Sequence, residues 1–432
     1  MSKVIQQAVI LAGGHGRRLE KSGISKPKIL LNVEGKTLLE NHISELEKNG
    51  FSNLIISLGV KSEVVIDFIK TIDTSLRIDI VIDEVLSGTR NAIIQTKNLL
   101  EPRFLLIMGD IYHKNFVKDF MSYSTSVENL DSEAIFSARW TDHPDDSDLV
   151  FIDENDFIIE LQSKNNLKRE IAQNLSLSGL AVLSKKIIKL LDSKSHLSDY
   201  TDAIFSDENI IKKYKAHVSS SLILDLGTLE RLESISKILA NKKKRPAVFF
   251  DRDGTLIEHV HLISSEDQVK LVPAAQQVCD YFKSHDFYLV CISNMPQVSR
   301  NILTFKQAHV LSNRILKFFE VKQTRFDAFY ICPHHPSSGF IDEISKFKKV
   351  CDCRKPSPGL IVRALRDLDI DLSKSLVIGD SWRDIRLGND LGLKTIMIKS
   401  QYSNELLAKP DYSYTSMEEL LEALESNRVG EL

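Results

Sequence analysis

The sequence predicts two α/β domains, each with a mostly parallel sheet covered by helices. At 432 residues the chain is too long for one ordinary core, and usual domain sizes favour two compact units. In both halves, short apolar runs alternate with helical patterns, which is typical of parallel sheets. A basic run that ends in Pro246 separates the halves. We therefore expect domains at 1–238 and 247–432, joined by a linker at 239–246.

In each half, strands are expected where apolar residues run together, and helices where they recur every three to four residues. In the first half, Gly50 closes the helical pattern. The predicted elements there are strands at 8–11, 54–58, 78–82 and 104–108 and a helix at 37–49. In the second half they are strands at 247–251, 287–293, 326–332, 375–380 and 394–398, and helices at 273–284, 305–320, 358–368 and 382–391.

The charge balance gives no general attraction for nucleic acid or an anionic membrane, since 56 Lys and Arg oppose 59 Asp and Glu. The basic run at 239–246 is either a nucleic-acid patch or a solvated linker, and we favour the linker. No apolar run reaches the length of a membrane span, and residues 1–7 lack a signal-peptide core. These features predict a cytoplasmic protein without a nucleic-acid or membrane partner, and they leave a homo-oligomer open.

A glycine-rich loop follows the first predicted strand. Glycine lets the backbone approach a nucleotide closely, so that its amides can face phosphate oxygens; the alternative is a plain turn between strand and helix. Arg18 and Lys28 supply cations near this loop, and Asp110 and Asp225 each end an apolar run where carboxylates can hold Mg²⁺. The loop residues expected at the nucleotide are Leu11, Ala12, Gly13, Gly14 and Gly16.

The order of several short motifs resembles that of sugar-1-phosphate nucleotidyltransferases over residues 7–235. These motifs are Val9 to Leu19, Lys26-Pro27-Lys28, Gly88-Thr89, Gly109-Asp110, Ser178-Gly179 and Ile223 to Thr228. Within that family, the chain is most similar to heptose-1-phosphate guanylyltransferases. The resemblance implies a Rossmann-like nucleotidyltransferase fold acting on GTP and the α anomer of heptose 1-phosphate.

The same resemblance assigns roles to single residues. It implies that Lys28 and Arg18 face the nucleotide phosphates, that Asp110 and Asp225 hold Mg²⁺, and that Lys164 contacts the sugar phosphate. It places Gly88, Thr89 and Gly179 at the substrate.

A pair of aspartates two residues apart follows the first strand of the second half. Asp251 can attack phosphorus while Asp253 protonates the leaving oxygen and later deprotonates water. Mg²⁺ would screen the repulsion between this nucleophile and an anionic ester, and we expect Asp251, Asp253 and Asp380 to hold it. The further phosphate-binding residues are expected to be Ser293, Asn294, Arg354 and Lys355.

Taken alone, Asp251-Arg252-Asp253-Gly254-Thr255 is also compatible with a calcium loop or a turn. Together with Ser293, Lys355 and Gly379-Asp380, it resembles the haloacid dehalogenase superfamily over about residues 247–425. The spacing leaves no room for a large cap domain, so loops are expected to shape the substrate pocket.

Three cysteines and a histidine are spaced as in a structural zinc site. Cys332, His334, Cys351 and Cys353 provide three thiolates and one imidazole, which predicts a closed tetrahedral site that staples a loop. His335 is the competing histidine, and a redox cysteine is the weaker alternative. The expected zinc is structural and holds Arg354 and Lys355 at the phosphate. Two further cysteines, Cys279 and Cys291, are expected in the core.

The zinc loop resembles that of D-glycero-D-manno-heptose-1,7-bisphosphate 7-phosphatases and of histidinol-phosphate phosphatases. The long segment between His334 and Cys351 fits the heptose family better. Together, the two resemblances imply a bifunctional enzyme that removes the 7-phosphate of heptose 1,7-bisphosphate and then makes GDP-heptose. The alternatives are a hexose-1-phosphate nucleotidyltransferase fused to another phosphatase, and a sugar-nucleotide-binding scaffold with one inactive half.

Overall fold

The structure is a computed structural model of the chain. It describes residues 5–14, 26–33, 35–83, 88–113, 116–126, 129, 132–141, 144, 147–164, 170–207, 213–218, 223–225, 244–320, 324–337 and 339–426. The chain forms two compact units. The first comprises Met1–Arg139, Val150–Gln162 and Leu175–Lys242, and the second comprises Trp140–Leu149, Ser163–Asn174 and Lys243–Leu432.

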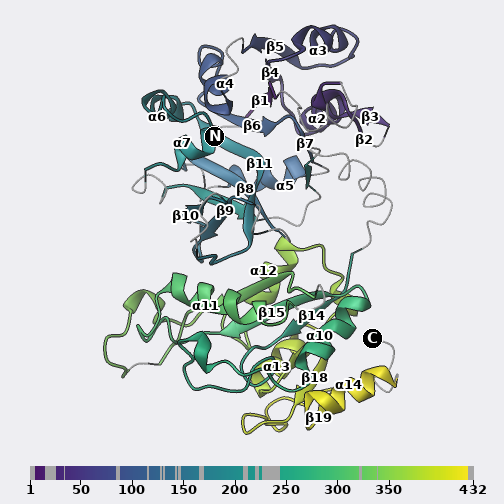
Figure 1. Ribbon diagram of the computed structural model, residues 1–432, viewed down its shortest axis with the longest axis vertical. Helices are drawn as coiled ribbons and strands as arrows, with labels where there is room; N and C mark the ends of the chain where they lie inside the picture. Colours follow the sequence, from purple (N-terminus) through teal and green to yellow (C-terminus); the bar gives the residue numbers. More distant parts are fainter. Residues whose placement is uncertain are drawn as a thin grey trace. The chain divides into compact units, whose positions relative to one another are not determined.

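The first unit is built on a mixed sheet. Its strands are β1 (Gln7–Ala12), β4 (Asn53–Leu58), β5 (Arg77–Ile82), β6 (Arg103–Met108), β8 (Ala134–Trp140), β9 (Leu149–Ile152), β10 (Ile158–Gln162), β11 (Leu175–Ser184) and β12 (Lys215–Val218). Within the described residues their order is β10-β9-β11-β6-β1-β4-β5, and β8 pairs with β11 and β12 (Figure 1). The strands β5, β4, β1 and β6 run parallel, whereas β11 is antiparallel to β6. The predicted parallel core is therefore present, with an antiparallel extension on one side.

Shorter elements surround this sheet. The strand pairs are β2 (Asn32–Val33) with β3 (Lys36–Thr37), and β7 (Ile111–His113) with β13 (Ile223–Asp225). The helices are η1 (Lys28–Leu30), α2 (Leu38–Lys48), α3 (Ser62–Ile69), α4 (Thr89–Gln95), α5 (Phe116–Ser124), α6 (Ile187–Ser193) and α7 (Tyr200–Ile204).

The helix α2 shows how the sequence fixes an element. Thr37 caps its start, accepting a hydrogen bond from the backbone N–H of Glu40 while the Glu40 carboxylate accepts from that of Thr37. Leu39, Ile43 and Leu46 recur at helical spacing and are buried in one core with strand residues of β1 and β4. The predicted helix at 37–49 is thereby confirmed to within one residue at each end.

The second unit is built on a parallel sheet. Its strands are β14 (Ala247–Phe250), β15 (Tyr288–Asn294), β16 (Ala328–Cys332), β17 (Leu376–Gly379), β18 (Lys394–Ile398) and β19 (Tyr412–Tyr414). Their order is β16-β15-β14-β17-β18-β19, and every neighbouring pair is parallel. All five predicted strands are present, and β19 is an addition at the edge that the sequence analysis did not include.

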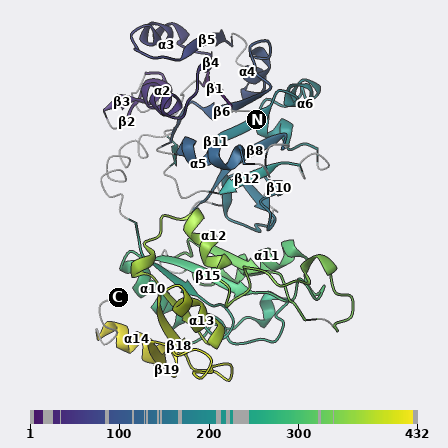
Figure 2. The same ribbon diagram turned by 180° about the vertical axis from the view of Figure 1, so that it is seen from behind.

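Helices cover both faces of this sheet (Figure 2). They are α10 (Ala275–Ser284), α11 (Phe305–Lys317), α12 (Gly359–Asp367), α13 (Trp382–Asp390) and α14 (Met417–Glu425), with short turns η4 (Glu266–Gln268), η5 (Ser345–Phe347) and η6 (Leu372–Lys374). Along β14, Val248 and Phe250 pack with α10, α11 and α14, whereas Ala247 and Phe249 pack with α12 and α13. Because both faces of β14 are buried in this way, its sequence is a continuous apolar run.

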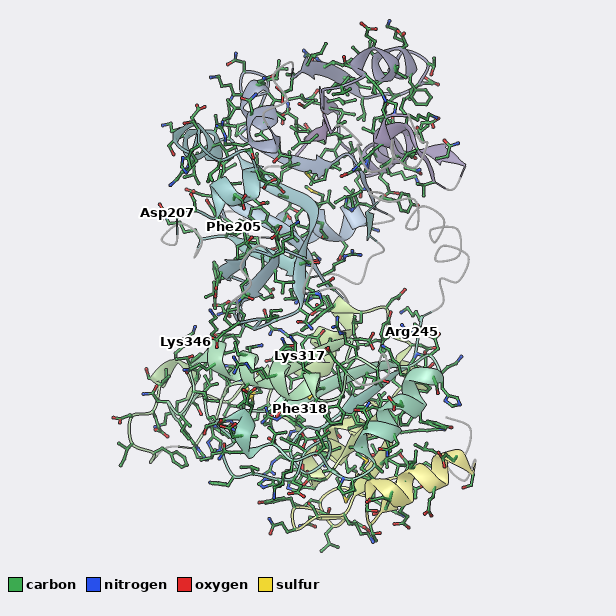
Figure 3. All side chains as sticks on the ribbon, in the orientation of Figure 1. Phe205, Asp207, Arg245, Lys317, Phe318 and Lys346 are labelled. Atoms are coloured by element: carbon green, nitrogen blue, oxygen red, sulfur yellow. The ribbon has the colours of Figure 1, made fainter. Side chains whose placement is uncertain are left out.

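Arg245, near the start of the second unit, contacts the first residue of β15 and the loop before it. The Arg245 guanidinium lies 4.2 Å from the centroid of the Tyr288 ring and 2.8 Å from a carboxylate oxygen of Asp286, and Figure 3 labels this residue. Of the predicted linker at 239–246, residues 239–243 lie outside the described residues. Among the helices that the structure describes, none is both long enough and apolar enough to cross a membrane.

Candidate active sites

The first candidate site is a pocket in the first unit, with a volume of about 240 Å³. It lies where β1 and β6 end, the edge at which open α/β sheets bind ligands. The structure brings eight of the predicted residues to this pocket, while Gly179 and Lys164 do not line it. Its lining is Leu11, Ala12, Gly13, Gly14, Pro27, Lys28, Ile29, Val60, Asp83, Gly88, Thr89, Ala92, Met108, Gly109 and Asp110.

An ion pair crosses this pocket. Lys28 donates a hydrogen bond of 2.9 Å to Asp110, and both side chains keep partial access to solvent. Asp225 is placed by backbone register, because it pairs with Ile111, the residue after Asp110. The pairing of β7 with β13 therefore places the backbone of Asp225 beside the residue that follows Asp110.

Two glycines are required by close backbone contacts. Gly88 has φ +103°, and a Cβ there would lie 2.4 Å from the carbonyl oxygen of Ser198. Gly109 approaches β1 so closely that a Cβ would lie 2.7 Å from the Leu11 carbonyl oxygen. Larger residues at either position would push the pocket walls apart.

Some predicted residues of this site are placed elsewhere or not described. Arg18 and Gly16 lie outside the described residues. Lys164 lies 3.7 Å from Asp148, and its backbone N–H donates to the same carboxylate at 2.9 Å. Gly179 lies in β11 beside Ile111, whose Cδ1 would be 2.1 Å from an added Cβ. Glycine at position 179 therefore allows β11 to pack closely against Ile111 of β7.

The second candidate site lies at the carboxyl edge of the sheet in the second unit. Asp251 directly follows β14, Ser293 and Asn294 end β15, and Asp380 directly follows β17. Because these strands are adjacent and parallel, their ends converge on one edge of the sheet. The structure thus brings together residues that are about 130 positions apart in the sequence.

Lys355 is the charged centre of this site. Its ammonium group is buried and lies 2.6 Å from Asp251 and 2.7 Å from Asp384. It also donates to the Ile292 carbonyl oxygen at 2.9 Å. Burial alone would lower the pKa of Lys355, but the carboxylates of Asp251 and Asp384 raise it overall, so the side chain is cationic at neutral pH.

Three buried carboxylates face this single lysine. Asp251, Asp380 and Asp384 each offer an oxygen within 4.8 Å of the others. Burial raises the pKa of Asp251 well above its usual range, and burial together with nearby Asp384 raises the pKa of Asp380 to about 7. Oδ2 of Asp380 is buried and has no hydrogen-bond partner among the described residues. Such a set of hard oxygen donors fits a divalent cation, which would offset the excess negative charge.

Asp384 was not among the residues expected from the sequence. It lies in the first turn of α13, four residues after Asp380, and its carboxylate accepts from the Ser381 hydroxyl at 2.7 Å. The signal that could have found it is the spacing Asp380 to Asp384, which places two carboxylates at the start of one helix. Asp253, which was also expected in the metal set, forms an ion pair with Arg252 at 2.8 Å.

Three cysteines form a compact cluster with His334, namely Cys332, Cys351 and Cys353. Cys332 Sγ lies 3.6 Å from Cys351 Sγ and 3.3 Å from Cys353 Sγ, and Nδ1 of His334 lies 3.2 Å from Cys353 Sγ. Ligands at about 2.3 Å from a tetrahedral zinc ion would be separated by roughly 3.8 Å, close to these values. Hydrogen bonding with Cys332 lowers the pKa of Cys351 to about 5 and that of Cys353 to about 7, which favours thiolates. The four side chains fit a tetrahedral metal ion, and His335 lies outside their cluster.

The cluster is joined directly to residues that were expected to bind phosphate. Arg354 donates to the His334 carbonyl oxygen at 2.9 Å. The Asn294 side chain accepts from the Lys355 N–H at 3.0 Å and donates to the Lys355 carbonyl oxygen at 3.2 Å. Lys355 is therefore fixed both by its position two residues after Cys353 and by the end of β15.

Models of known protein families match both units of the chain. The family model described as nucleotidyl transferase matches residues 7–242, more than half of the chain. The chain belongs to the nucleotidyl transferase family. A second family model, described as haloacid dehalogenase (HAD)-hydrolase-like, matches residues 352–420 of the second unit. This nucleotidyl transferase therefore carries an additional hydrolase domain.

Curated relatives of this nucleotidyl transferase identify the additional domain more closely. A D-glycero-beta-D-manno-heptose-1,7-bisphosphate 7-phosphatase from Yersinia pestis is 29% identical over 42% of this chain and 96% of that protein. A phosphatase of the same name from Photorhabdus laumondii is 35% identical over 33% of this chain and 73% of that protein. The chain also belongs to the family of these phosphatases, and it combines a nucleotidyltransferase with a phosphatase in one polypeptide.

Solved structures include similar chains. The crystal structure of HddC from Yersinia pseudotuberculosis is 27% identical, with a TM-score of 0.44, and the match covers 54% of this chain and 100% of that chain.

Proposed function

We propose that the protein catalyses two consecutive steps in the synthesis of a nucleotide-activated heptose. The second unit removes the 7-phosphate from D-glycero-D-manno-heptose 1,7-bisphosphate. The first unit then transfers GMP from GTP to the heptose 1-phosphate, giving GDP-heptose and pyrophosphate. One observation carries the proposal: a phosphatase whose relatives are named for a sugar bisphosphate shares a chain with a nucleotidyl transferase, whose motifs resemble those of enzymes that act on sugar 1-phosphates.

In the proposed phosphatase step, a carboxylate oxygen of Asp251 attacks phosphorus, and the bond to the sugar oxygen breaks. Asp253 gives its proton to that leaving oxygen, then removes a proton from the water that hydrolyses the aspartyl phosphate. Lys355 lies 2.6 Å from Asp251, where its charge offsets the negative charge of the phosphoryl group. Ser293 and Asn294 at the end of β15, with Arg354, are proposed to hold the phosphoryl oxygens.

Mg²⁺ bound here would neutralise phosphate charge and orient the ester toward the nucleophile. The proposed ligands are Asp251 and Asp380, to which the described geometry adds Asp384. The Asp253 carboxylate, which the sequence analysis also placed in the metal set, is proposed to serve as acid and base.

In the proposed transferase step, the phosphate oxygen of heptose 1-phosphate attacks the α-phosphorus of GTP, and pyrophosphate leaves. The sugar phosphate is itself the nucleophile, so the protein supplies positioning and charge. Lys28 and Arg18 are proposed to face the nucleotide phosphates, and Asp110 and Asp225 to hold Mg²⁺. The 240 Å³ pocket between the β1 loop and the start of α4, with Lys28 and Asp110 in its wall, supports this assignment.

Zinc is the proposed occupant of the cluster formed by Cys332, His334, Cys351 and Cys353. Its proposed role is structural, since four protein ligands leave no open position for a substrate. The ion would hold the segment that delivers Arg354 and Lys355 to the phosphatase site.

A mass-spectrometric assay tests the proposed function. The purified protein would be incubated with Mg²⁺, heptose 1,7-bisphosphate of each anomer, and each nucleoside triphosphate in turn. Both anomers are needed because the name of the Yersinia pestis phosphatase specifies the β form, whereas the transferase resemblance implies the α form. Formation of GDP-heptose is expected. Release of phosphate without a nucleotide sugar would contradict the transferase half, and no turnover would contradict both halves.

A further inference from the structure

Arg252, the residue between the two aspartates of the phosphatase site, has no role in the steps described so far. Its side chain is fully buried, so it cannot touch a substrate. Its guanidinium group makes a two-point contact with the neighbouring carboxylate: Nε donates to Asp253 Oδ1 at 2.9 Å, and Nη2 donates to Asp253 Oδ2 at 2.8 Å. Such a fork fixes both the position and the plane of a carboxylate, which a single hydrogen bond does not.

The other end of the guanidinium is also held. Nη1 donates to the Ser312 hydroxyl at 3.2 Å and contacts Met295 Sδ at 3.4 Å. Ser312 lies on α11 and Met295 directly follows β15, so two separate elements hold the arginine. A buried guanidinium with donors satisfied on both sides has little freedom to rotate.

The backbone around Arg252 is equally constrained. Its carbonyl oxygen accepts from the N–H groups of Leu256 and Ile257 at 2.9 and 3.0 Å, and its own N–H donates to Asp251 at 2.7 Å. The arginine is therefore fixed to the nucleophile by its backbone and to Asp253 by its side chain. The relative placement of the two aspartates follows from this one residue.

We propose that Arg252 is a positioning residue that fixes the Asp253 carboxylate in the orientation from which it protonates the leaving sugar oxygen. The inference rests on the proposed phosphatase function. When the bond from phosphorus to the sugar oxygen breaks, the electron pair stays on that oxygen, and the Asp253 proton moves onto it. An alkyl oxygen needs this proton, whereas a nitrophenyl oxygen leaves readily without it.

The test compares Arg252→Lys with the wild-type protein on two substrates, heptose 1,7-bisphosphate and p-nitrophenyl phosphate. Lysine keeps the positive charge but cannot make the two-point contact. The measured quantity is kcat/KM, which covers the steps up to departure of the leaving group. For the heptose substrate we expect a loss of about 100-fold, at the low end of general-acid effects, and for p-nitrophenyl phosphate a change within about threefold.

Arg386→Lys is the matched control. Arg386 also contacts one aspartate at two points, with Nε 2.8 and 3.0 Å from the oxygens of Asp390, but the pair lies exposed on α13. This variant should leave both substrates unchanged. An equal loss on both substrates in Arg252→Lys would mean that the arginine only supports the fold, and this outcome would overturn the proposal.

A second comparison distinguishes an effect that acts through Asp253 from a general folding defect. Arg252→Lys is combined with Asp253→Asn, which already removes the proton donor. If the arginine acts through Asp253, the double variant should be no slower on heptose 1,7-bisphosphate than Asp253→Asn alone, whereas additive losses would contradict the proposal. A wild-type protein that hydrolyses neither phosphate ester would defeat the proposed function, while normal hydrolysis without a substrate-dependent loss would defeat only the role of Arg252.

Discussion

The two sites differ in how much of their chemistry the protein itself provides. The phosphatase site concentrates buried charge, with Lys355 held between Asp251 and Asp384. The transferase site is a pocket lined by backbone and apolar groups, and its described ion pair, Lys28 with Asp110, is partly open to solvent. A step that forms a bond to the protein needs a nucleophile fixed in place. A step in which both reactants are bound molecules needs mainly a shaped surface and a few charges.

Loss of the nucleophile should produce the largest difference between the two sites. Asp251→Asn removes the oxygen that we propose attacks phosphorus, so phosphate release should fall by more than about 10³-fold. GDP-heptose formation from supplied heptose 1-phosphate should be unchanged. Asp390→Asn, an exposed aspartate on α13, is the control. Loss of both activities in Asp251→Asn would refute the independence of the two sites.

The reciprocal change should affect only the transferase. Lys28→Ala removes the cation in the pocket wall, and nucleotidyl transfer should fall by about 10²- to 10³-fold while phosphate release stays constant. Lys70→Ala is the matched control, because Lys70 makes a comparable 2.8 Å pair with Asp67 on the exposed surface. A fall in transfer that is equal in both variants would show that charge at the pocket has no special role.

Removal of a proposed zinc ligand should lower phosphatase activity by disturbing the segment that carries Lys355. We expect Cys353→Ser to lose bound zinc and most phosphatase activity, because Lys355 lies two residues away, while nucleotidyl transfer persists. The measurements are elemental analysis and the two activity assays. Cys279→Ala, a core cysteine outside the cluster, should retain the metal. Zinc-free wild-type protein with full phosphatase activity would contradict the proposed role.

A glycine comparison tests how tightly the phosphatase site is packed. Gly254 has φ +84°, and a Cβ there would lie 2.2 Å from Asp380 Oδ2, so Gly254→Ala should displace that carboxylate and lower phosphatase activity by at least about tenfold. Gly392 also has a positive φ, but an added Cβ meets nothing within 4 Å. Gly392→Ala should therefore cost about 1 kcal/mol of stability and leave the activity intact. Equal activities in both variants would argue against a crowded metal site.

The smallest expected effect concerns acid stability. Burial, with the nearby charge of Arg363, lowers the pKa of His309 to about 3. Below pH 6.5, His309 binds a proton in the unfolded chain but stays neutral in the folded chain. The free energy of unfolding therefore decreases as the pH falls. From pH 7 to pH 5 the second unit should lose about 2 kcal/mol of unfolding free energy at this residue.

The acid effect can be isolated by substitution. His309→Leu should reduce the loss of stability between pH 7 and pH 5, as measured by urea unfolding at both values. His285→Gln, which replaces an exposed histidine stacked on Tyr281, should leave the loss unchanged. An identical pH dependence in His309→Leu and wild type would contradict the assigned pKa.

The sequence predicted the sheets well because buried parallel strands are continuous apolar runs. The convergence of Asp251, Ser293 and Asp380 followed from the same rule, since parallel strands end at one edge. The strands β8 to β12 of the first sheet were not predicted, since only continuous apolar runs were taken as strands. The first residues of β11 (Leu175–Ser184) alternate Leu and Ser, which is typical of a half-buried strand. Its antiparallel pairing with β6 joins residues that are far apart in the sequence.

Contacts that depend on side-chain packing between elements could not be predicted. The approach of Asp384 to Lys355 requires both the start of α13 and the segment that follows Cys353. By contrast, the sequence analysis had already chosen His334 over His335, and Nδ1 of His334 lies 3.2 Å from Cys353 Sγ in the structure. The contact between Arg252 and Asp253 joins neighbouring residues, yet nothing in the spacing of Asp251-Arg252-Asp253 reveals a buried arginine.

The most direct test of two separate sites that catalyse consecutive steps is complementation between variants. Asp251→Asn and Lys28→Ala proteins would each be incubated with heptose 1,7-bisphosphate, GTP and Mg²⁺, first alone and then mixed, with GDP-heptose measured by mass spectrometry. We predict little product from either variant alone and substantial product from the mixture, because free heptose 1-phosphate passes from one protein to the other. Absence of product from the mixture, with each remaining single activity intact, would contradict two independent sites linked by a diffusing intermediate.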